Sequence, residues 1–214
     1  MNVKLINYSH SPDGMNLLEQ VAFAARVSNP ANQHNSETAE KLVRYLIKHQ
    51  HWSPLEMVSV CMEIQTTRDI ARQILRHRSF SFQEFSQRYA EVDFDWVERE
   101  ARLQDTKNRQ NSIDTDDFAL QQGWATQQSY VTFAAEKAYQ WAIKNGIAKE
   151  QARAVLPEGI TQSRLYMNGT LRSWVHYIQL RSSNGTQKEH MEVARACAVA
   201  LEPIFPMIQE FVNV

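Results

Sequence analysis

The chain has 214 residues, of which 43% are hydrophobic, and its formal charge at pH 7 is -1. A chain of this size can bury about 70% of its unfolded surface, so we expect one domain over residues 1–214. The near-neutral charge gives no general attraction to nucleic acid, and no apolar run reaches the roughly 20 residues of a membrane span. Cys61 and Cys197 lie far apart without CxxC spacing. These features predict a reduced, cytoplasmic protein that binds neither membranes nor nucleic acid.

The first elements alternate between strand and helix patterns. Residues 3–7 have the pattern of a short strand, and apolar positions at helical spacing predict a helix from residue 17 to about residue 26. A polar loop over residues 29–35 follows. A second helix is then expected to begin at a cap formed by Asn35 or Ser36 and to end near His49.

A strand with one buried face is predicted over residues 58–65, because apolar and polar side chains alternate there. It leads into a predicted helix over residues 66–75, which has a threonine cap and Asp69 in its first turn. The arginine-rich run 76–89 therefore begins at the end of a helix, where the chain changes direction.

Residues 90–124 are rich in acidic side chains and have no regular hydrophobic period. We expect a long loop region with short helices. Such a segment is either a mobile cover for a functional site or a solvated insertion, and the second is the more common case.

The rest of the chain is predicted to be mainly helical. The expected elements are a long helix through Tyr130 and Trp141 that ends at Asn145-Gly146, a short helix over 149–156, an extended segment over 160–168, and helices over 171–180, over 187–201 and on to Val212. Together these patterns predict an α/β protein of the α+β type, in which several helices flank a central antiparallel or mixed sheet.

Several common catalytic motifs are absent from the sequence. The glycines do not cluster, so there is neither a P-loop nor a GxGxxG motif, and the histidines show no zinc-ligand spacing, so no metal is expected. Cys61 and Cys197 lie within strand and helix patterns, as core cysteines do. Ser86 has no obvious base beside it. These absences favour an electrostatic mechanism without an enzyme nucleophile.

Arginines dominate the run Arg76–Tyr89, which also holds hydroxyl groups, a carboxylate and several phenylalanines. A guanidinium group matches the geometry of phosphate and stays charged at any working pH. Arg76, Arg78 and Arg88 therefore form a candidate binding site for a small polar anion. An alternative is a non-catalytic nucleotide- or RNA-binding module that uses the basic and aromatic side chains of this run.

Three more arginines, Arg153, Arg172 and Arg181, lie at or beside the ends of predicted helices. For any one of them taken singly, a surface ion pair is the more common explanation. If several converge, an anionic ligand is needed to compensate their charge, because an unpaired buried charge is costly.

The run also carries a specific signature. The order Arg76-His77-Arg78, seven residues, Ser86, one residue and Arg88 closely resembles the motif of the flavin-dependent thymidylate synthases. Other segments resemble the family in the same order and spacing: Ala25-Arg26-Val27-Ser28, His51-x-Ser53-Pro54-x-Glu56, Ala152-Arg153-x-x-Leu156-Pro157, and Arg172 with Leu180-Arg181. The chain departs from the family pattern at Met57, Thr170 and Gly185, where His, Asn and His are usual.

This resemblance implies an enzyme that methylates dUMP to dTMP. The one-carbon unit would come from methylenetetrahydrofolate, and NADPH would supply reducing equivalents through bound FAD. The resemblance also implies a homotetramer with active sites shared between subunits.

The same resemblance implies two sets of site residues. The residues expected to hold dUMP are Gln73, Arg76, Glu84, Ser86, Gln87, Arg88, Arg153 and Arg181. The residues expected to contact FAD are Ser28, His51, Ser53, Arg76, His77, Arg78, Glu84, Thr170, Arg172 and His176. Arg181 is the catalytic candidate, because a guanidinium beside the N3–O4 edge of uracil would favour the anionic ring.

Overall fold

The centre of the computed structural model, which describes residues 1–213, is a four-stranded antiparallel sheet with the strand order β1-β2-β6-β3. A separate hairpin pairs β4 with β5. The strands are β1 (Asn2–Tyr8), β2 (Ser59–Thr67), β3 (Phe80–Glu84), β4 (Arg102–Gln104), β5 (Ser112–Asp114) and β6 (Gln162–Thr170).

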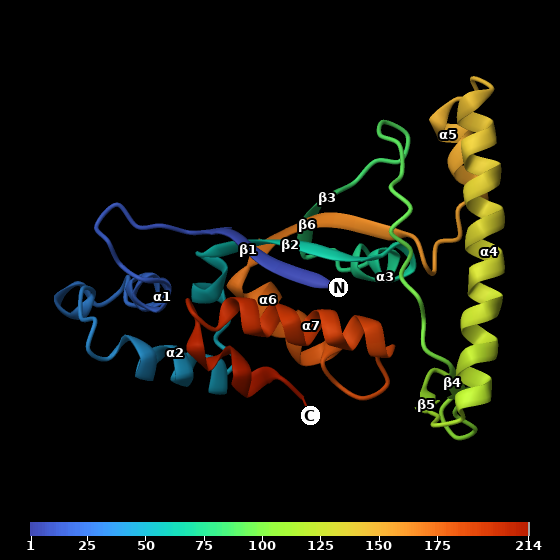
Figure 1. Ribbon diagram of the computed structural model, residues 1–214. Helices are drawn as coiled ribbons and strands as arrows, with labels where there is room; N and C mark the ends of the chain where they lie inside the picture. The colour runs from blue at the N-terminus through green and yellow to red at the C-terminus, as the bar shows by residue number, and fades with distance from the viewer. Residues whose placement is uncertain (214) are drawn as a thin grey trace.

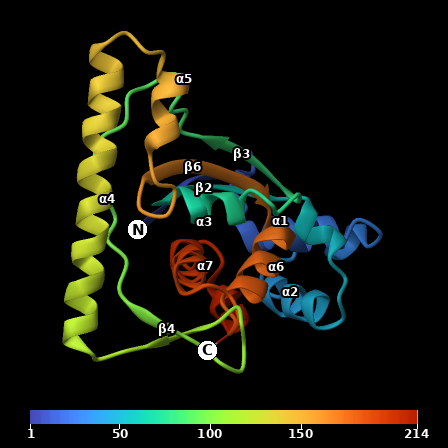
Figure 2. The same cartoon turned by 90° about the vertical axis from the view of Figure 1, so that its right-hand side faces the viewer.

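Helices cover one face of the sheet and both of its ends. They are α1 (Leu17–Ala25), α2 (Ala39–Lys48), α3 (Arg68–Ile74), α4 (Phe118–Lys144), α5 (Lys149–Ala152), α6 (Leu171–Arg181) and α7 (Lys188–Leu201), with the 3-10 helices η1 (Pro30–Asn32), η2 (Ser53–Glu56), η3 (Arg153–Val155) and η4 (Pro206–Phe211). Figure 1 shows α6 and α7 below the sheet, α1 and α2 at one end, and α4 standing at the other end. In Figure 2, α5 lies beside α4. The predicted α+β architecture is confirmed.

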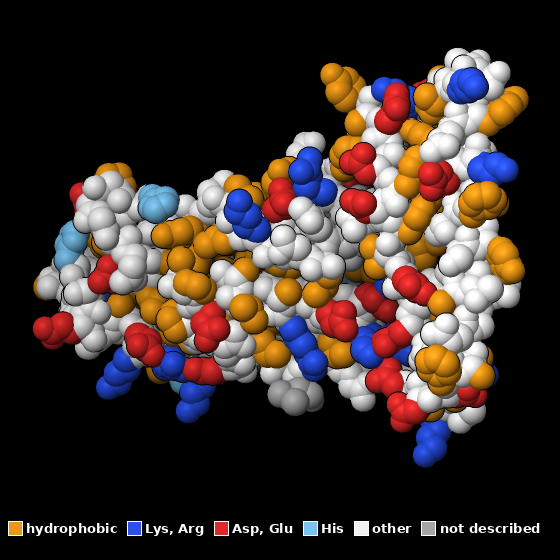
Figure 3. All heavy atoms as spheres, viewed as in Figure 1, with side chains coloured by type: hydrophobic (Ala, Val, Ile, Leu, Met, Phe, Trp, Pro, Cys, Tyr) orange, Lys and Arg blue, Asp and Glu red, His pale blue; other side chains and the backbone are white. Residues whose placement is uncertain are grey.

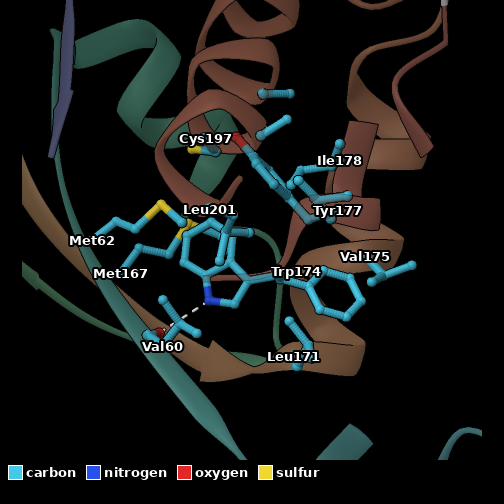
Figure 4. Close-up of a cluster of buried hydrophobic side chains, with 14 of the residues drawn as sticks. Val60, Met62, Met167, Leu171, Trp174, Val175, Tyr177, Ile178, Cys197 and Leu201 are labelled. Atoms are coloured by element: carbon cyan, nitrogen blue, oxygen red, sulfur yellow. Dashed lines mark hydrogen bonds between the residues drawn. The ribbon is translucent and has the colours of Figure 1, made fainter. Parts of the chain in front are cut away.

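The main core lies between the sheet and α6 and α7. Val60 and Met62 of β2 and Met167 of β6 are fully buried, while the residues between them point to the opposite, polar face. Trp174 and Tyr177 of α6 fill the space beneath the strands (Figure 4). The indole nitrogen of Trp174 donates a hydrogen bond of 3.0 Å to the carbonyl of Val60. The alternation of side chains on β2 and β6 thus fixes which face receives the helices.

Two strand–helix units, β2-α3 and β6-α6, are joined without a loop. β2 and β6 pair antiparallel over their whole length, so α3 and α6 begin at opposite ends of the pair and run toward each other. A nine-residue strand is about 30 Å long, and helices of seven and eleven residues together span about 27 Å. The C-terminal ends of the two helices therefore meet on the covered side of the sheet.

The observed elements differ from the predicted ones at a few boundaries. The helix predicted over residues 66–75 begins later, because Thr66 and Thr67 continue the β2 ladder opposite Ser163 and Gln162. Part of the arginine-rich run forms β3, which is not among the predicted strands. Thr38, rather than Asn35 or Ser36, stands at the start of α2.

The prediction for residues 90–124 is wrong at its C-terminal end. Helix α4 already starts at Phe118, where the carboxylate of Asp117 accepts a hydrogen bond of 3.0 Å from the amide of Leu120. The apolar side chains that predict this long helix face outward. Tyr130, Phe133 and Trp141 are 66%, 64% and 62% exposed.

Gly169 is required for the packing of β6. A Cβ atom there would lie 2.4 Å from Cδ1 of Phe80, and the buried Phe80 ring is held edge-on to Trp174, with ring centroids 4.9 Å apart. We expect Gly169→Ala to lower the free energy of unfolding by about 1–3 kcal/mol, because the core must shift to accept the methyl group.

Thermal unfolding of a matched variant, Gly123→Ala, provides the control. A Cβ at Gly123 in α4 meets no atom within 4 Å, so this change should stabilise the helix by up to about 1 kcal/mol. Equal unfolding midpoints for the two variants would contradict this account of Gly169.

Candidate active site

The converging ends of α3 and α6 bring Arg181 and His77 together. Nε of Arg181 donates a hydrogen bond of 3.0 Å to Nε2 of His77. The imidazole is therefore neutral and carries its proton on Nδ1. Burial is the main cause that lowers the pKa of His77 to about 4, and the charges of Arg181 and Arg76 add to it. His77 thus acts as a neutral acceptor that fixes the orientation of the Arg181 guanidinium.

Behind this pair lies a second neutral imidazole, His190 of α7, which is fully buried. Its Nδ1 is 3.3 Å from Oε1 of Gln73, and its Nε2 is 3.1 Å from the hydroxyl of Tyr177. Burial, followed by the charge of Arg181, lowers the pKa of His190 to about 3. His190 is absent from the predicted site residues, although a polar side chain on the apolar face of α7 is a signal of a buried, hydrogen-bonded group.

Positive charge accumulates at this junction without compensation. Arg76 and Arg78 follow α3 and are exposed. Among residues 1–213, no carboxylate forms an ion pair with Arg76, Arg78 or Arg181. Three guanidinium groups without a counter-charge form a site that an anionic ligand would stabilise.

Glu84, at the end of β3, is held by three side chains. Its Oε1 accepts a hydrogen bond of 2.8 Å from Ser163 and lies 3.5 Å from Nη1 of Arg68. Its Oε2 lies 3.7 Å from Nη1 of Arg72. Arg68 is only 5% exposed, and its Nη1 has no hydrogen-bond partner in the part of the chain that the structure describes. The carboxylate of Glu84 is thus fixed in position before any ligand binds.

The remaining predicted dUMP residues form a second cluster at the far end of β3. Arg88 lies 3.5 Å from the carboxylate of Glu150, and Nε of Arg153 donates 3.3 Å to the Glu150 carbonyl. Gln87, which precedes Arg88 in the chain, is buried, and its Nε2 lacks a partner among the described residues. Ser86 is exposed and begins the turn that carries this cluster. The five residues of β3, about 16 Å of strand, separate these side chains from the Arg181–His77 junction.

Two predicted FAD residues lie on the outer side of α6. Arg172 forms an ion pair with Glu56 of η2, and the ring of His176 packs edge-on against Trp52 at 4.5 Å. Thr170 caps α6, since its Oγ1 accepts a hydrogen bond of 3.3 Å from the amide of the third helical residue. Thr preserves the capping role that Asn would have at this position.

The other predicted FAD residues lie toward α1 and η2. Ser53 lines a largely apolar groove of about 580 Å³ together with Val27 and Met57. Ser28 follows Val27 in the chain and is exposed, and the ring of His51 is exposed beside η2. These residues therefore do not meet the Arg181–His77 junction directly within one chain.

The predicted site residues do not include a network of charged residues around Glu189, at the start of α7. Arg99 pairs with Asp69 at 2.9 Å and with Glu189 at 3.0 Å, and Arg102 also pairs with Glu189. Arg99 and Glu189 line a cavity of about 420 Å³. Both arginines lie in the segment predicted as a loop, where sequence periodicity gives no signal.

The described residues contain no group of three or more His, Cys, Asp and Glu side chains placed to hold a metal ion. None of the helices over residues 1–213 combines the length and apolarity needed to cross a bilayer.

The structure is that of an α+β protein with arginine side chains gathered where two helices end, and comparisons with known proteins show its family. Residues 4–207 match the family model described as thymidylate synthase complementing protein. The chain is 49% identical over 210 residues to the probable flavin-dependent thymidylate synthase of Paramecium bursaria Chlorella virus 1, which covers 97% of each chain. It is 46% identical over 198 residues to the flavin-dependent thymidylate synthase of Synechocystis sp., covering 92% of this chain and 88% of the relative.

A solved structure shows the same fold. The UMP/dUMP methylase PolB from Streptomyces cacaoi, in a structure bound with 5-Br dUMP, matches with a TM-score of 0.83 and 28% identity over 98% of this chain and 93% of the other. The chain therefore belongs to the flavin-dependent thymidylate synthase family and is an enzyme. The family resemblance of its sequence is confirmed.

Acid should destabilise this protein through His77 and His190. Their folded-state pKa values of about 4 and about 3 lie below the ordinary value of 6.5. Below about pH 6.5 the unfolded chain therefore binds more protons than the folded chain, so the free energy of unfolding falls as the pH drops toward 4. We expect the thermal unfolding midpoint to decrease over this range.

The variant His190→Gln should show a smaller decrease, because a glutamine can form hydrogen bonds without titrating. The exposed His34 provides the control, and His34→Gln should keep the wild-type pH dependence. A wild-type slope in His190→Gln would show that His190 does not contribute to the acid sensitivity.

Proposed function

We propose that this chain methylates dUMP to dTMP, with methylenetetrahydrofolate as the carbon donor and NADPH as the source of reducing equivalents through bound FAD. The observation that carries the proposal is that Arg76, Arg78 and Arg181, at or just after the converging helix ends, form no ion pair with a carboxylate among the described residues. The names of the two relatives and the 5-Br dUMP bound to the solved neighbour support the same reaction class.

The nucleotide would lie along β3, between the two arginine clusters. Arg88 and Arg153 at one end would contact its phosphate, and Arg181 at the other end would contact the base. Arg88 pairs only with the exposed carboxylate of Glu150, and Arg153 donates only to the backbone carbonyl of the same residue. Both contacts are weak, so a phosphate could displace them.

Arg181 would activate the uracil ring. Its Nε is occupied by His77, so the two Nη groups remain as donors in a fixed direction. Placed at the N3–O4 edge of uracil, these donors stabilise the anionic form of the ring and make it a better carbon nucleophile. No covalent bond to the enzyme is then required.

The two thiols are consistent with a mechanism without an enzyme nucleophile. Cys197 is fully buried, and burial raises its pKa far above the ordinary value. Burial also raises the pKa of Cys61. Neither thiol is therefore poised to form a thiolate.

The residues near the junction fit a flavin dinucleotide. Bound FAD supplies hydride-transfer chemistry. Arg76 and Arg78 present exposed guanidinium groups that could hold its two phosphates, and His77 presents a neutral imidazole to it. Arg76 and Glu84 would lie at the border between FAD and dUMP. Arg172 and His176 on α6, with Ser28, His51, Ser53 and Thr170 toward η2, would line the rest of the site.

We also propose a homotetramer in which copies of the chain share active sites. Two observations support it. The predicted FAD residues near η2 do not meet the Arg181–His77 junction within one chain, and α4 presents large apolar side chains to solvent. In Figure 3 these side chains stand out along α4 at the right of the molecule. A second copy that covers α4 could complete the site.

Arg181→Ala should lower dTMP formation by about 10²–10³-fold or more, because it removes preorganised donors at the developing charge. The assay measures turnover of dUMP with FAD, NADPH and methylenetetrahydrofolate. Arg44→Ala provides the control, because Arg44 is exposed on α2 and pairs with Glu40. Wild-type turnover by a folded Arg181→Ala protein would remove Arg181 from the mechanism.

A further inference from the structure

Five polar side chains form a continuous hydrogen-bonded chain from the core of α6 to the start of α7. We call it the donor chain, and its members are Tyr177, His190, Gln73, Gln187 and Glu189. His190 lies between the Tyr177 hydroxyl and Oε1 of Gln73, at 3.1 and 3.3 Å. Nε2 of Gln73 donates 2.7 Å to Gln187, whose Nε2 donates 2.9 Å to Glu189.

The direction of the donor chain is set by its last member. A carboxylate can only accept hydrogen bonds, so Gln187 must turn its NH₂ group toward Glu189 and its carbonyl toward Gln73. Gln73 must then donate to Gln187 and accept from Nδ1–H of His190, and Nε2 of His190 accepts from Tyr177. Every other member can reverse its role, because amides, a neutral imidazole and a hydroxyl can each both donate and accept.

Glu189 is itself held firmly as an anion. Arg99 lies 3.0 Å from its Oε1, and Arg102 contacts the same oxygen. The other oxygen, Oε2, accepts from Gln187. The ion pairs and the hydrogen bond thus use different oxygens, so the arginines anchor the carboxylate without competing with Gln187 for it.

We propose that Glu189 is a positioning residue that fixes the orientation of the Gln73 side-chain amide toward the nucleotide. The inference rests on the proposed function and on the expectation from the sequence that Gln73 contacts dUMP. Reversal of the donor chain would rotate the Gln73 amide and exchange a donor for an acceptor at the same place. A ligand matched to one orientation would then lose a hydrogen bond and face an unsatisfied group.

The test measures dUMP affinity of the FAD-loaded enzyme by calorimetry. Glu189→Gln removes the obligatory acceptor with little change of shape, and we expect it to weaken dUMP binding about tenfold. Glu192→Gln provides the control, since Glu192 lines the same cavity but takes no part in the donor chain. It should bind dUMP as the wild type does.

A double variant separates orientation from stability. In Glu189→Gln/Gln187→Glu the carboxylate moves from position 189 to position 187. At position 187 it can only accept a hydrogen bond from Gln73, as the Gln187 carbonyl does in the wild type. Both variants lack the carboxylate at position 189 that Arg99 and Arg102 bind, so loss of those ion pairs is common to them. We expect the double variant to recover dUMP affinity to within about twofold of the wild type. Binding no tighter than that of Glu189→Gln would overturn the inference.

Gln73→Ala distinguishes the possible failures. If it weakens dUMP binding while Glu189→Gln does not, the inference fails and the proposed nucleotide site stands. If Gln73→Ala binds dUMP as tightly as the wild type, Gln73 does not contact the nucleotide, and both the inference and that part of the proposed site are wrong.

Discussion

The antiparallel pairing of β2 with β6 is the constraint on which the rest of the structure depends. Each strand continues directly into a helix, and the full-length register from Ser59–Thr170 to Thr67–Gln162 sets where each helix begins. Because the strands run in opposite directions, the helices converge, and their C-terminal ends meet. Arg181 and His77 are more than 100 residues apart in sequence, yet they form a direct hydrogen bond for this reason.

This convergence also explains the electrostatics of the site. The C-terminal ends of helices favour cations, and two such ends lie together here. Burial, and after it the positive groups at the junction, lowers the pKa of both nearby imidazoles, which remain neutral and accept hydrogen bonds. Paired carboxylates lie farther out, at Glu84 and Glu189, where arginines outside the junction hold them. The carboxylates are thus paired away from the junction, so among the described residues none neutralises Arg76, Arg78 or Arg181.

Much of the fold follows from the sequence, because β2, α6 and α7 have clear periodicity and one buried face each. The signature Arg76–Arg88 indicates the family and the candidate ligand residues. Sequence periodicity does not predict the secondary structure where tertiary contacts decide the conformation. Thr66 and Thr67 extend a strand instead of starting a helix, and residues 118–124 are helical despite their irregular apolar pattern.

The site is less predictable than the fold. Local sequence gives no sign that Gln73 is linked to Glu189 through Gln187, because these side chains come from α3 and from the segment that begins α7. Local sequence also does not show that Arg99 and Arg102 pair with Glu189, because residues 90–124, which contain both arginines, lack a regular hydrophobic pattern. The predicted ligand residues lie in separate groups within one chain: at the Arg181–His77 junction, beyond the end of β3, and near η2. The sequence motifs do not reveal this separation.

Flavin and nucleotide are proposed to meet where α3 and α6 converge. The most direct test is to saturate the purified protein with FAD, remove the excess, and record its visible spectrum without oxygen before and after adding NADPH, with and without dUMP. The account predicts that flavin is retained, that NADPH bleaches it, and that dUMP changes the rate of bleaching. Failure to retain flavin, or a bleaching rate that is the same with and without dUMP, would contradict a shared site.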